Sequence, residues 1–276
     1  MKRRFTQLDV FTAVALRGNP LAVVHDADGL DDERMAAFAR WTNLSETTFL
    51  LPPSDPAADY RVRIFTPIGE LPFAGHPTLG SCHAWLAAGG APKDARDVVQ
   101  QCGVGLVTVR RDGARLAFAA PPLRRSGPLD DGTLGTVRAA LRLDASDVVG
   151  HQWVDNGPGW CAVMLPSAQA VRALVPDWAA LGTLKLGVIG PQPAGDETQF
   201  EVRSFIGGGN FEDPVTGSLN AGLAMWLIGA GLAPEAYVAA QGHALQRAGR
   251  VHVRREGGRV WVGGDVSPCI DGEVDL

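Results

Sequence analysis

Two segments of the sequence place polar side chains beside a glycine, after a Glu-x-Pro pattern. The first runs from Glu70 to His76 and the second from Glu212 to Ser218. Each stands directly before an apolar stretch that we predict to be helical, so its polar groups lie with the unpaired N–H groups of a first helical turn. Such a terminus attracts anions, and the chemistry it favours is the binding of a carboxylate-bearing substrate.

The apolar stretches behind these segments predict two buried helices. They cover Thr78–Ala88 and Ser218–Ala230, are apolar on nearly all sides, and have a glycine just past the end. Strands wrapped around one buried helix would give each half of the chain its core.

The two segments belong to an internal repeat with offsets of about 140 residues. Val62–Phe65 recurs as Val202–Phe205, and Val107–Leu116 recurs as Val251–Val260. In the last block, turn residues between apolar runs predict a β-hairpin in each half. Matched blocks in the same order indicate two structurally equivalent halves.

We therefore predict an α/β (α+β) fold of two halves, residues 1–120 and 121–276, each a mixed β-sheet or barrel around a central helix. The Pro- and Gly-rich stretch Ala120–Gly135 forms the junction. If the halves pack face to face, both helix termini converge on one cleft, where we expect the active site. Two placements stay open for the segment from about Val266, on the second half or back on the first.

Composition excludes several classes of function. The 276 residues are 46% hydrophobic and 20% charged, as in a soluble globular protein. A formal net charge of -5 and scattered arginines argue against a nucleic-acid partner. No apolar run approaches the roughly 20 residues of a membrane span, and Met1–Arg4 precedes no apolar signal region. We expect a cytoplasmic protein without a membrane partner.

The sequence also lacks the patterns of metal and nucleotide sites. Gly207–Gly209 has neither the spacing nor the downstream residues of a nucleotide-binding loop. The six histidines are dispersed, and no cysteine pair has CxxC spacing, so we predict no bound metal and reduced, structural thiols. The cysteines are Cys82, Cys102, Cys161 and Cys269.

Three segments resemble the signature segments of the PhzF-like phenazine-biosynthesis family. They are Asn43–Phe49, Glu70–Thr78 and Glu212–Ser218. Further stretches fit as well, so the resemblance runs along essentially the whole chain; they are Asp9–Thr12, Gly18–Val24, Gln241–Gly242 and Val262–Gly264.

The resemblance implies a diaminopimelate epimerase-like fold and a cofactor-independent isomerase of a small carboxylated metabolite. It assigns the proton shuttle to Glu46, since a partly buried carboxyl group can take a proton from one carbon and return it to another. The best-known family reaction, isomerisation of trans-2,3-dihydro-3-hydroxyanthranilate, is a candidate, and a homodimer is the family expectation. The substrate-binding residues that it implies are Gly75, His76, Asp213, Thr216, Gly217 and Ser218.

In the epimerases of this fold, two cysteines exchange protons with opposite faces of a carbon. Ala74 and Thr216 stand at the corresponding positions here, so a two-thiol mechanism is excluded. An epimerase or dehydratase of a hydroxylated or amino acid, using Thr216 or Glu46, stays open as an alternative. So does a catalytically silent protein that binds a small ligand.

Structural roles stay open for several of these residues. Asp213 could act only as a helix N-cap before Pro214, and Ser218 only as a cap of its helix. Leu219 stands where the family usually has a small residue, and we expect it to reshape the pocket wall. Two glutamates, Glu70 and Glu212, are interpreted as structural residues that pair either with backbone N–H groups or with Arg63 and Arg203.

Overall fold

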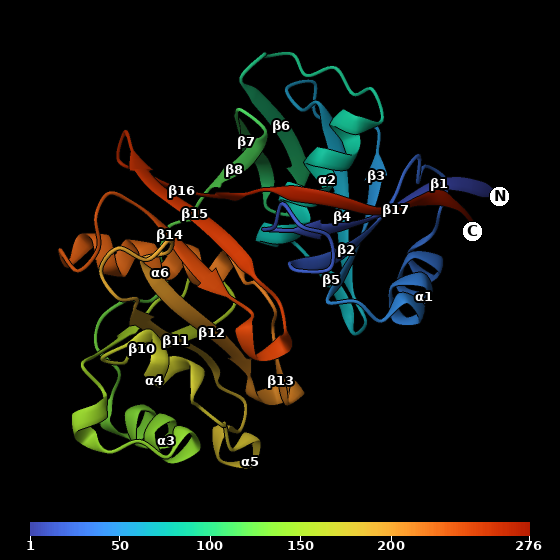
Figure 1. Ribbon diagram of the computed structural model, residues 1–276. Helices are drawn as coiled ribbons and strands as arrows, with labels where there is room; N and C mark the ends of the chain where they lie inside the picture. The colour runs from blue at the N-terminus through green and yellow to red at the C-terminus, as the bar shows by residue number, and fades with distance from the viewer. The chain divides into compact units, whose positions relative to one another are not determined.

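The computed structural model describes residues 1–276, which form two compact units (Figure 1). The first unit consists of Met1–Ala119 and Gly263–Leu276, and the second of Ala120–Val262. Both units combine helices with strands in parallel and antiparallel pairs. The predicted α/β (α+β) fold class is confirmed.

The first unit places a helix, α2, among most of its strands. This helix contacts β1 to β4 and β6 to β8, whereas α1 packs on β3 and β4. In chain order the elements are β1 (Lys2–Val10), β2 (Asn19–Val24), α1 (Asp32–Thr42), β3 (Glu46–Leu51), β4 (Tyr60–Thr66), β5 (Gly69–Leu71), α2 (Gly75–Ala87), β6 (Asp97–Cys102), β7 (Gly105–Asp112), β8 (Arg115–Ala119) and β17 (Val266–Asp275).

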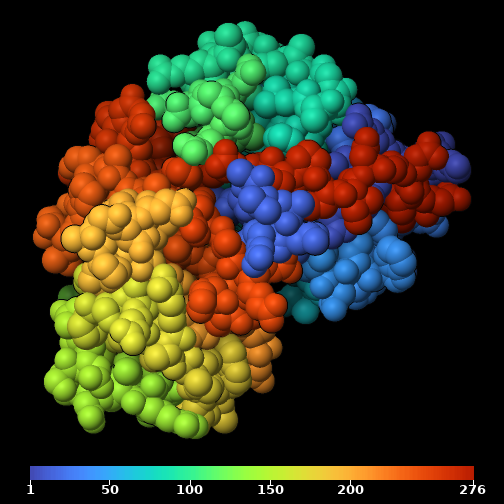
Figure 2. All heavy atoms as spheres, viewed as in Figure 1, coloured from blue at the N-terminus to red at the C-terminus, as the bar shows by residue number.

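The last strand, β17, belongs to the first unit. It pairs antiparallel with β1, from Lys2 opposite Asp275 to Val10 opposite Val266. The space-filling view shows the red C-terminal residues beside the blue N-terminal ones (Figure 2). The two ends of the chain also meet, because the Met1 amino group donates to the Leu276 carbonyl at 2.6 Å.

The second unit is built around α6, which is buried along most of its length and contacts β10 and β15. Short 3-10 turns cover residues 145–147, 207–209 and 243–245. The other elements are α3 (Asp131–Leu141), β9 (Gly150–Trp153), β10 (Trp160–Met164), α4 (Ala168–Arg172), α5 (Trp178–Leu181), β11 (Lys185–Pro191), β12 (Phe200–Ile206), β13 (Phe211–Glu212), α6 (Gly217–Gly229), β14 (Ala236–Gln241), β15 (Gly249–Glu256) and β16 (Arg259–Gly264), whose last two residues lie in the first unit.

The second unit repeats the strand pairing of the first. In the first unit, β2 and β3 are parallel, β3 and β4 antiparallel, and β4 and β6 parallel. The same series is formed by β10, β11, β12 and β14. A short strand pairs antiparallel just before each buried helix, β5 with β4 and β13 with β12. The prediction of two structurally equivalent halves is confirmed.

Two glycines let the buried helices approach their neighbours closely. A Cβ atom on Gly80 of α2 would lie 2.5 Å from Leu21 Cδ2, and one on Gly222 of α6 would lie 2.2 Å from the Val154 carbonyl oxygen. Both glycines are the sixth residue of their helix. A side chain at either position would push apart the helix and the segment packed on it.

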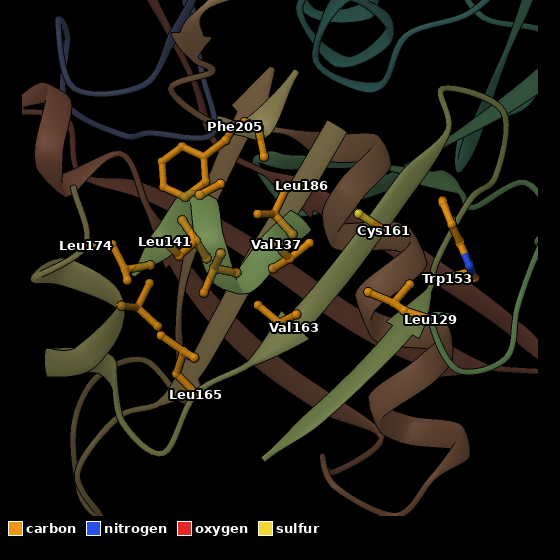
Figure 3. Packing of buried hydrophobic residues seen from close by; sticks show 14 residues of the cluster. Leu129, Val137, Leu141, Trp153, Cys161, Val163, Leu165, Leu174, Leu186 and Phe205 are labelled. Atoms are coloured by element: carbon orange, nitrogen blue, oxygen red, sulfur yellow. The ribbon is translucent and has the colours of Figure 1, made fainter. Parts of the chain in front are cut away.

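A second layer of helices covers the strands of the second unit. Leucine and valine side chains of α3 and α4 meet β10, β11 and Phe205 of β12 in one apolar cluster (Figure 3). The counterpart in the first unit is a smaller, aromatic-rich cluster in which α1 packs on β3 and β4. These cores hold the strands whose ends carry the predicted site residues.

Both buried helices are present, but they begin before the residues that we predicted. The first begins at Gly75 instead of Thr78, so His76 and Pro77 lie in its first turn. Proline is tolerated there because the first N–H groups of a helix have no partner within the helix. The second begins at Gly217, one residue earlier than predicted.

Candidate functional site

The first set of predicted site residues lies where β3 and α2 begin. Glu46 is the first residue of β3, and Gly75 and His76 are the first two of α2. The Nε2 atom of His76 lies 3.4 Å from Oε2 of Glu46, and the two side chains are 6% and 15% exposed. The structure therefore brings an imidazole and a carboxyl group together at a nearly buried position.

The strand β2 holds both members of this pair. Glu46 stands opposite Leu21 in the parallel β2–β3 ladder, and the preceding residue, Pro20, forms a backbone hydrogen bond with the His76 ring. Proline has no N–H group, so its carbonyl accepts and the ring donates. The histidine ring is thus fixed by the strand that also aligns Glu46.

Burial determines the charge of His76. It lowers the pKa of the imidazole to about 3, although the hydrogen bond to Pro20 acts in the opposite direction. The ring is therefore neutral near pH 7. Its Nε2 atom is buried without a hydrogen bond and faces Glu46. An unprotonated imidazole nitrogen beside a carboxyl group can accept a hydrogen bond from its protonated form, and this arrangement suits Glu46 as a general acid–base group.

The second set lies at the beginning of α6. Asp213 stands between β13 and α6, Thr216 is the N-cap residue, and Gly217 and Ser218 open the helix. The Thr216 hydroxyl donates to Oδ2 of Asp213 at 2.5 Å. These four residues are close in sequence, so the fold of one short segment brings them together.

Ser218 is oriented by two residues from outside that segment. The indole Nε1 of Trp160 donates to its Oγ at 3.0 Å, and the side-chain amide of Asn156 donates to its carbonyl at 2.8 Å. An indole N–H group can only donate, so the Ser218 hydroxyl accepts here and keeps its own hydrogen for another acceptor. A carboxylate is such an acceptor.

Neither helix has a side-chain cap at its N-terminus. The N-cap residues are Ala74 in α2 and Thr216 in α6, and neither makes a capping hydrogen bond. The alternatives in which Asp213 serves as N-cap and Ser218 as cap are therefore wrong, because the helix begins between them. Uncapped first-turn N–H groups are donors for an anion.

The interpretation of two glutamates as structural is confirmed. Arg63 donates to both carboxylate oxygens of Glu70, at 2.8 and 2.6 Å. Arg203 donates to both oxygens of Glu212, at 3.0 and 2.7 Å. Each bidentate pair ties β4 or β12 to the segment that leads into the buried helix.

The expectation for Leu219 is wrong. Its side chain is fully buried, and its Cδ1 atom would lie 2.4 Å from a Cβ atom on Gly187. The absence of a side chain at Gly187 provides the space for this leucine. It is a core residue of the second unit.

Sequence reasoning missed several residues that hold these sets in place. Pro20 and Gln241 lie in segments that carried the resemblance, yet no role followed from it. Asn156 and Trp160 lie outside every motif, and their contacts with Ser218 span 62 and 58 positions. No local spacing could have revealed contacts between residues so distant in sequence.

All four cysteines are free thiols, and no group of three or more His, Cys, Asp or Glu side chains is placed to hold a metal ion. None of the helices combines the length and apolar character needed to cross a membrane.

The chain matches known proteins along nearly its whole length. A family model described as phenazine biosynthesis-like protein (PhzC-PhzF) matches residues 8–272. Antisense-enhancing sequence 1 of Schizosaccharomyces pombe is 36% identical, over 98% of this chain and 97% of that protein. A trans-2,3-dihydro-3-hydroxyanthranilate isomerase of Pseudomonas chlororaphis is 35% identical, over 80% of this chain and 78% of that protein.

Solved structures agree with this assignment at the level of the fold. A PhzF family protein of Enterococcus faecalis has a TM-score of 0.83 at 24% identity, with 100% of both chains covered. A probable proline racemase of Agrobacterium radiobacter has a TM-score of 0.60 at 13% identity, over 99% of this chain and 93% of that one. With the two pseudo-symmetric halves, these likenesses establish the diaminopimelate epimerase-like fold. The chain belongs to the phenazine biosynthesis-like (PhzF) family and is an isomerase of that family.

Proposed function

We propose that this isomerase moves a proton within a small carboxylated metabolite, with Glu46 as the proton shuttle and without a cofactor. The observation that carries the proposal is the 3.4 Å contact between Glu46 Oε2 and His76 Nε2 at a nearly buried position. Glu46 would take a proton from one substrate carbon and return it to another, and the unprotonated Nε2 of His76 can accept a hydrogen bond from the protonated Glu46 carboxyl group between the two steps.

The second set supports a carboxylated substrate. The Ser218 hydroxyl accepts from Trp160 and so has its hydrogen to donate, and the N-terminus of α6 has no side-chain cap. A hydroxyl donor beside uncapped first-turn N–H groups suits a carboxylate. Asp213 is an acceptor for an amino or hydroxyl group of the same substrate.

The relative from Pseudomonas chlororaphis suggests the compound to test first. Trans-2,3-dihydro-3-hydroxyanthranilate carries a carboxylate, an amino group and a hydroxyl group. These match the donors of Ser218 and the acceptor oxygens of Asp213. We propose it as the first candidate substrate.

The experiment is proton NMR of the purified enzyme with this compound in D2O. We expect wild type to consume it and to incorporate deuterium at the carbon that receives the proton. Glu46→Gln should lower the rate by about 100-fold or more, since it removes the acid–base group. Glu33→Gln, at an exposed position in α1, is the matched control and should keep wild-type activity. Full activity of Glu46→Gln would exclude the proposed shuttle.

The alternatives give different spectra. An epimerase would exchange deuterium at one carbon and invert it without moving a double bond, and a dehydratase would release water. Ala74 offers no acid–base group for a second face, and Thr216 is already hydrogen-bonded to Asp213, so we favour the single shuttle. A catalytically silent protein would bind the compound, seen as line broadening, and leave it unchanged.

A further inference from the structure

Gln241, the last residue of β14, forms hydrogen bonds with both of its side-chain atoms and is only 1% exposed. Its Oε1 atom accepts from the Thr216 backbone N–H at 3.1 Å and from Asn220 Nδ2 at 2.9 Å. Its Nε2 atom donates to the Asp213 carbonyl at 3.1 Å and to the Thr216 hydroxyl at 3.0 Å. One buried amide thus contacts both ends of the segment that opens α6.

The partners leave this amide only one orientation. A backbone N–H group can only donate, so the atom facing the Thr216 N–H must be the oxygen. A backbone carbonyl can only accept, so the atom facing the Asp213 carbonyl must be the NH2 group. Reversing the amide would set donor against donor and acceptor against acceptor.

This orientation also fixes the hydrogen of the Thr216 hydroxyl. Gln241 Nε2 donates to the hydroxyl oxygen, so that oxygen acts as an acceptor on this side. Its own hydrogen is then directed to Oδ2 of Asp213, 2.5 Å away. The chain of donors runs from Gln241 through Thr216 to Asp213, and each link has a defined direction.

We infer that Gln241 is a positioning residue for the reaction. It holds the Thr216 hydroxyl as a donor to Asp213, which keeps the Asp213 carboxylate oriented toward the substrate and leaves Thr216 no part in proton transfer. The inference deepens the proposed function and rests on it, because it concerns the group that is proposed to bind the amino or hydroxyl function of the substrate.

The first unit contains a natural control for this role. Whereas Gln241 of β14 lies opposite Val202, the third residue of β12, Gln100 of β6 lies opposite Tyr60, the first residue of β4. It is also fully buried and bonds the fourth residue of the neighbouring helix, donating to Thr78 Oγ1 at 3.1 Å. The N-cap residue of that helix, however, is Ala74, which has no hydroxyl group to orient. Gln100 therefore has the burial of Gln241 without a hydroxyl at the N-cap to position.

The test uses Gln241→Glu with Gln100→Glu as its control. Both variants bury a carboxyl group in place of an amide, so a loss of stability is common to both. At pH 8 the carboxylate introduced at position 241 has no hydrogen to donate to the Thr216 hydroxyl. It accepts the hydrogen of that hydroxyl instead, so the hydrogen no longer points to Asp213. Once protonated, the introduced carboxyl group can donate again. We therefore expect kcat/KM of Gln241→Glu to fall about tenfold or more at pH 8 and to recover toward wild type at pH 5, whereas Gln100→Glu should follow the wild-type pH profile.

Two variants of Thr216 complete the activity measurements. Thr216→Ser keeps the hydroxyl group and should stay within about threefold of wild type, while Thr216→Val removes it and should lose about tenfold. An unchanged pH profile in Gln241→Glu, or full activity in Thr216→Val, would overturn the inference.

A second readout does not depend on turnover. NMR of the wild type should show a slowly exchanging Thr216 hydroxyl proton, which should disappear in Gln241→Glu at pH 8 and remain in Gln100→Glu. If this holds while wild type is inert on trans-2,3-dihydro-3-hydroxyanthranilate, the proposed substrate fails and the positioning network stands. If the hydroxyl signal is unaffected by Gln241→Glu, the network itself is refuted.

Discussion

The indole of Trp160 and the hydroxyl of Ser218 meet at 3.0 Å, across 58 positions of the sequence. Trp160 is the first residue of β10 and is 3% exposed, whereas Ser218 is partly exposed in the first turn of α6. A rigid, buried donor thus sets the direction of a hydroxyl group that is accessible to a ligand.

Trp160→Phe should weaken substrate binding without slowing the chemical step. The variant keeps an aromatic ring but loses the N–H donor, so the Ser218 hydroxyl is free to rotate. Loss of one neutral hydrogen bond corresponds to a rise in KM of about threefold to tenfold, with kcat nearly unchanged. Steady-state kinetics of Trp160→Phe and Ser218→Ala measure this, with Trp153→Phe as the control. A lower kcat at constant KM would show that the contact acts in the transition state instead.

The sequence was sufficient for features that repeat or that depend on short-range pattern. The buried helices and the hairpin formed by β7 and β8 follow from local periodicity and from the repeat. For Glu70 and Glu212 the sequence offered arginines or backbone N–H groups as partners, and the structure shows the arginines. Glu46 was reached only through the family resemblance, because a glutamate at the start of a strand has no distinctive spacing.

The remaining parts of the site depend on contacts between distant residues. Gln241 holds Asp213 and Thr216, which precede α6, across 28 and 25 positions, and Trp160 orients Ser218 across 58 positions. The repeat itself also misleads about chemistry. Glu46 is the residue of β3 that lies opposite Leu21 in β2. The corresponding residue of the second unit is Lys185 of β11, which lies opposite Trp160 in β10. The duplication preserved the scaffold and not the functional groups.

The stability of the protein should depend on pH through His76. Burial lowers the pKa of this imidazole to about 3 in the folded state, whereas the unfolded chain has a value of about 6.5. Between these values the unfolded state binds more protons, so stability is complete above pH 6.5 and is lost as the pH falls toward 3. At pH 5 the loss from this residue is about 2 kcal/mol.

Urea unfolding of wild type and His76→Asn between pH 4.5 and 7.5 isolates this contribution. The free energy of unfolding of His76→Asn minus that of wild type should rise as the pH falls. His25 and His83, whose pKa values are also lowered by burial, contribute equally to both proteins and cancel. His243→Asn, at an exposed position, is the control for the substitution itself. Parallel curves for His76→Asn would mean that His76 is accessible to protons in the folded state.

The two equivalent ion pairs should differ in their importance for stability. Arg203 and Glu212 are 5% and 6% exposed, and Arg203 also donates to the Leu174 carbonyl at 2.6 Å. Arg203→Met leaves a buried carboxylate without its partner and should cost about 3–5 kcal/mol. Arg63 and Glu70 are 17% and 42% exposed, so Arg63→Met should cost only about 1 kcal/mol. Urea unfolding of both variants measures the difference, and equal losses would contradict the role assigned to burial.

The close approach at Gly222 gives the strictest test of the packing around α6. An added Cβ atom would meet the Val154 carbonyl oxygen at 2.2 Å, and a backbone oxygen cannot move aside as a side chain can. Gly222→Ala should therefore destabilise by about 1–3 kcal/mol or more, which lowers the Tm by several degrees at about 2–4 °C per kcal/mol.

Gly80→Ala, at the equivalent position of α2, meets the flexible end of Leu21 at 2.5 Å and should lose less stability. Gly229→Ala at the end of α6 has nothing within 4 Å and should be neutral or slightly stabilising, since alanine is the better helix former. If thermal denaturation places Gly222→Ala level with Gly229→Ala, the helix has room to shift, and the packing described for this unit is looser than its geometry indicates.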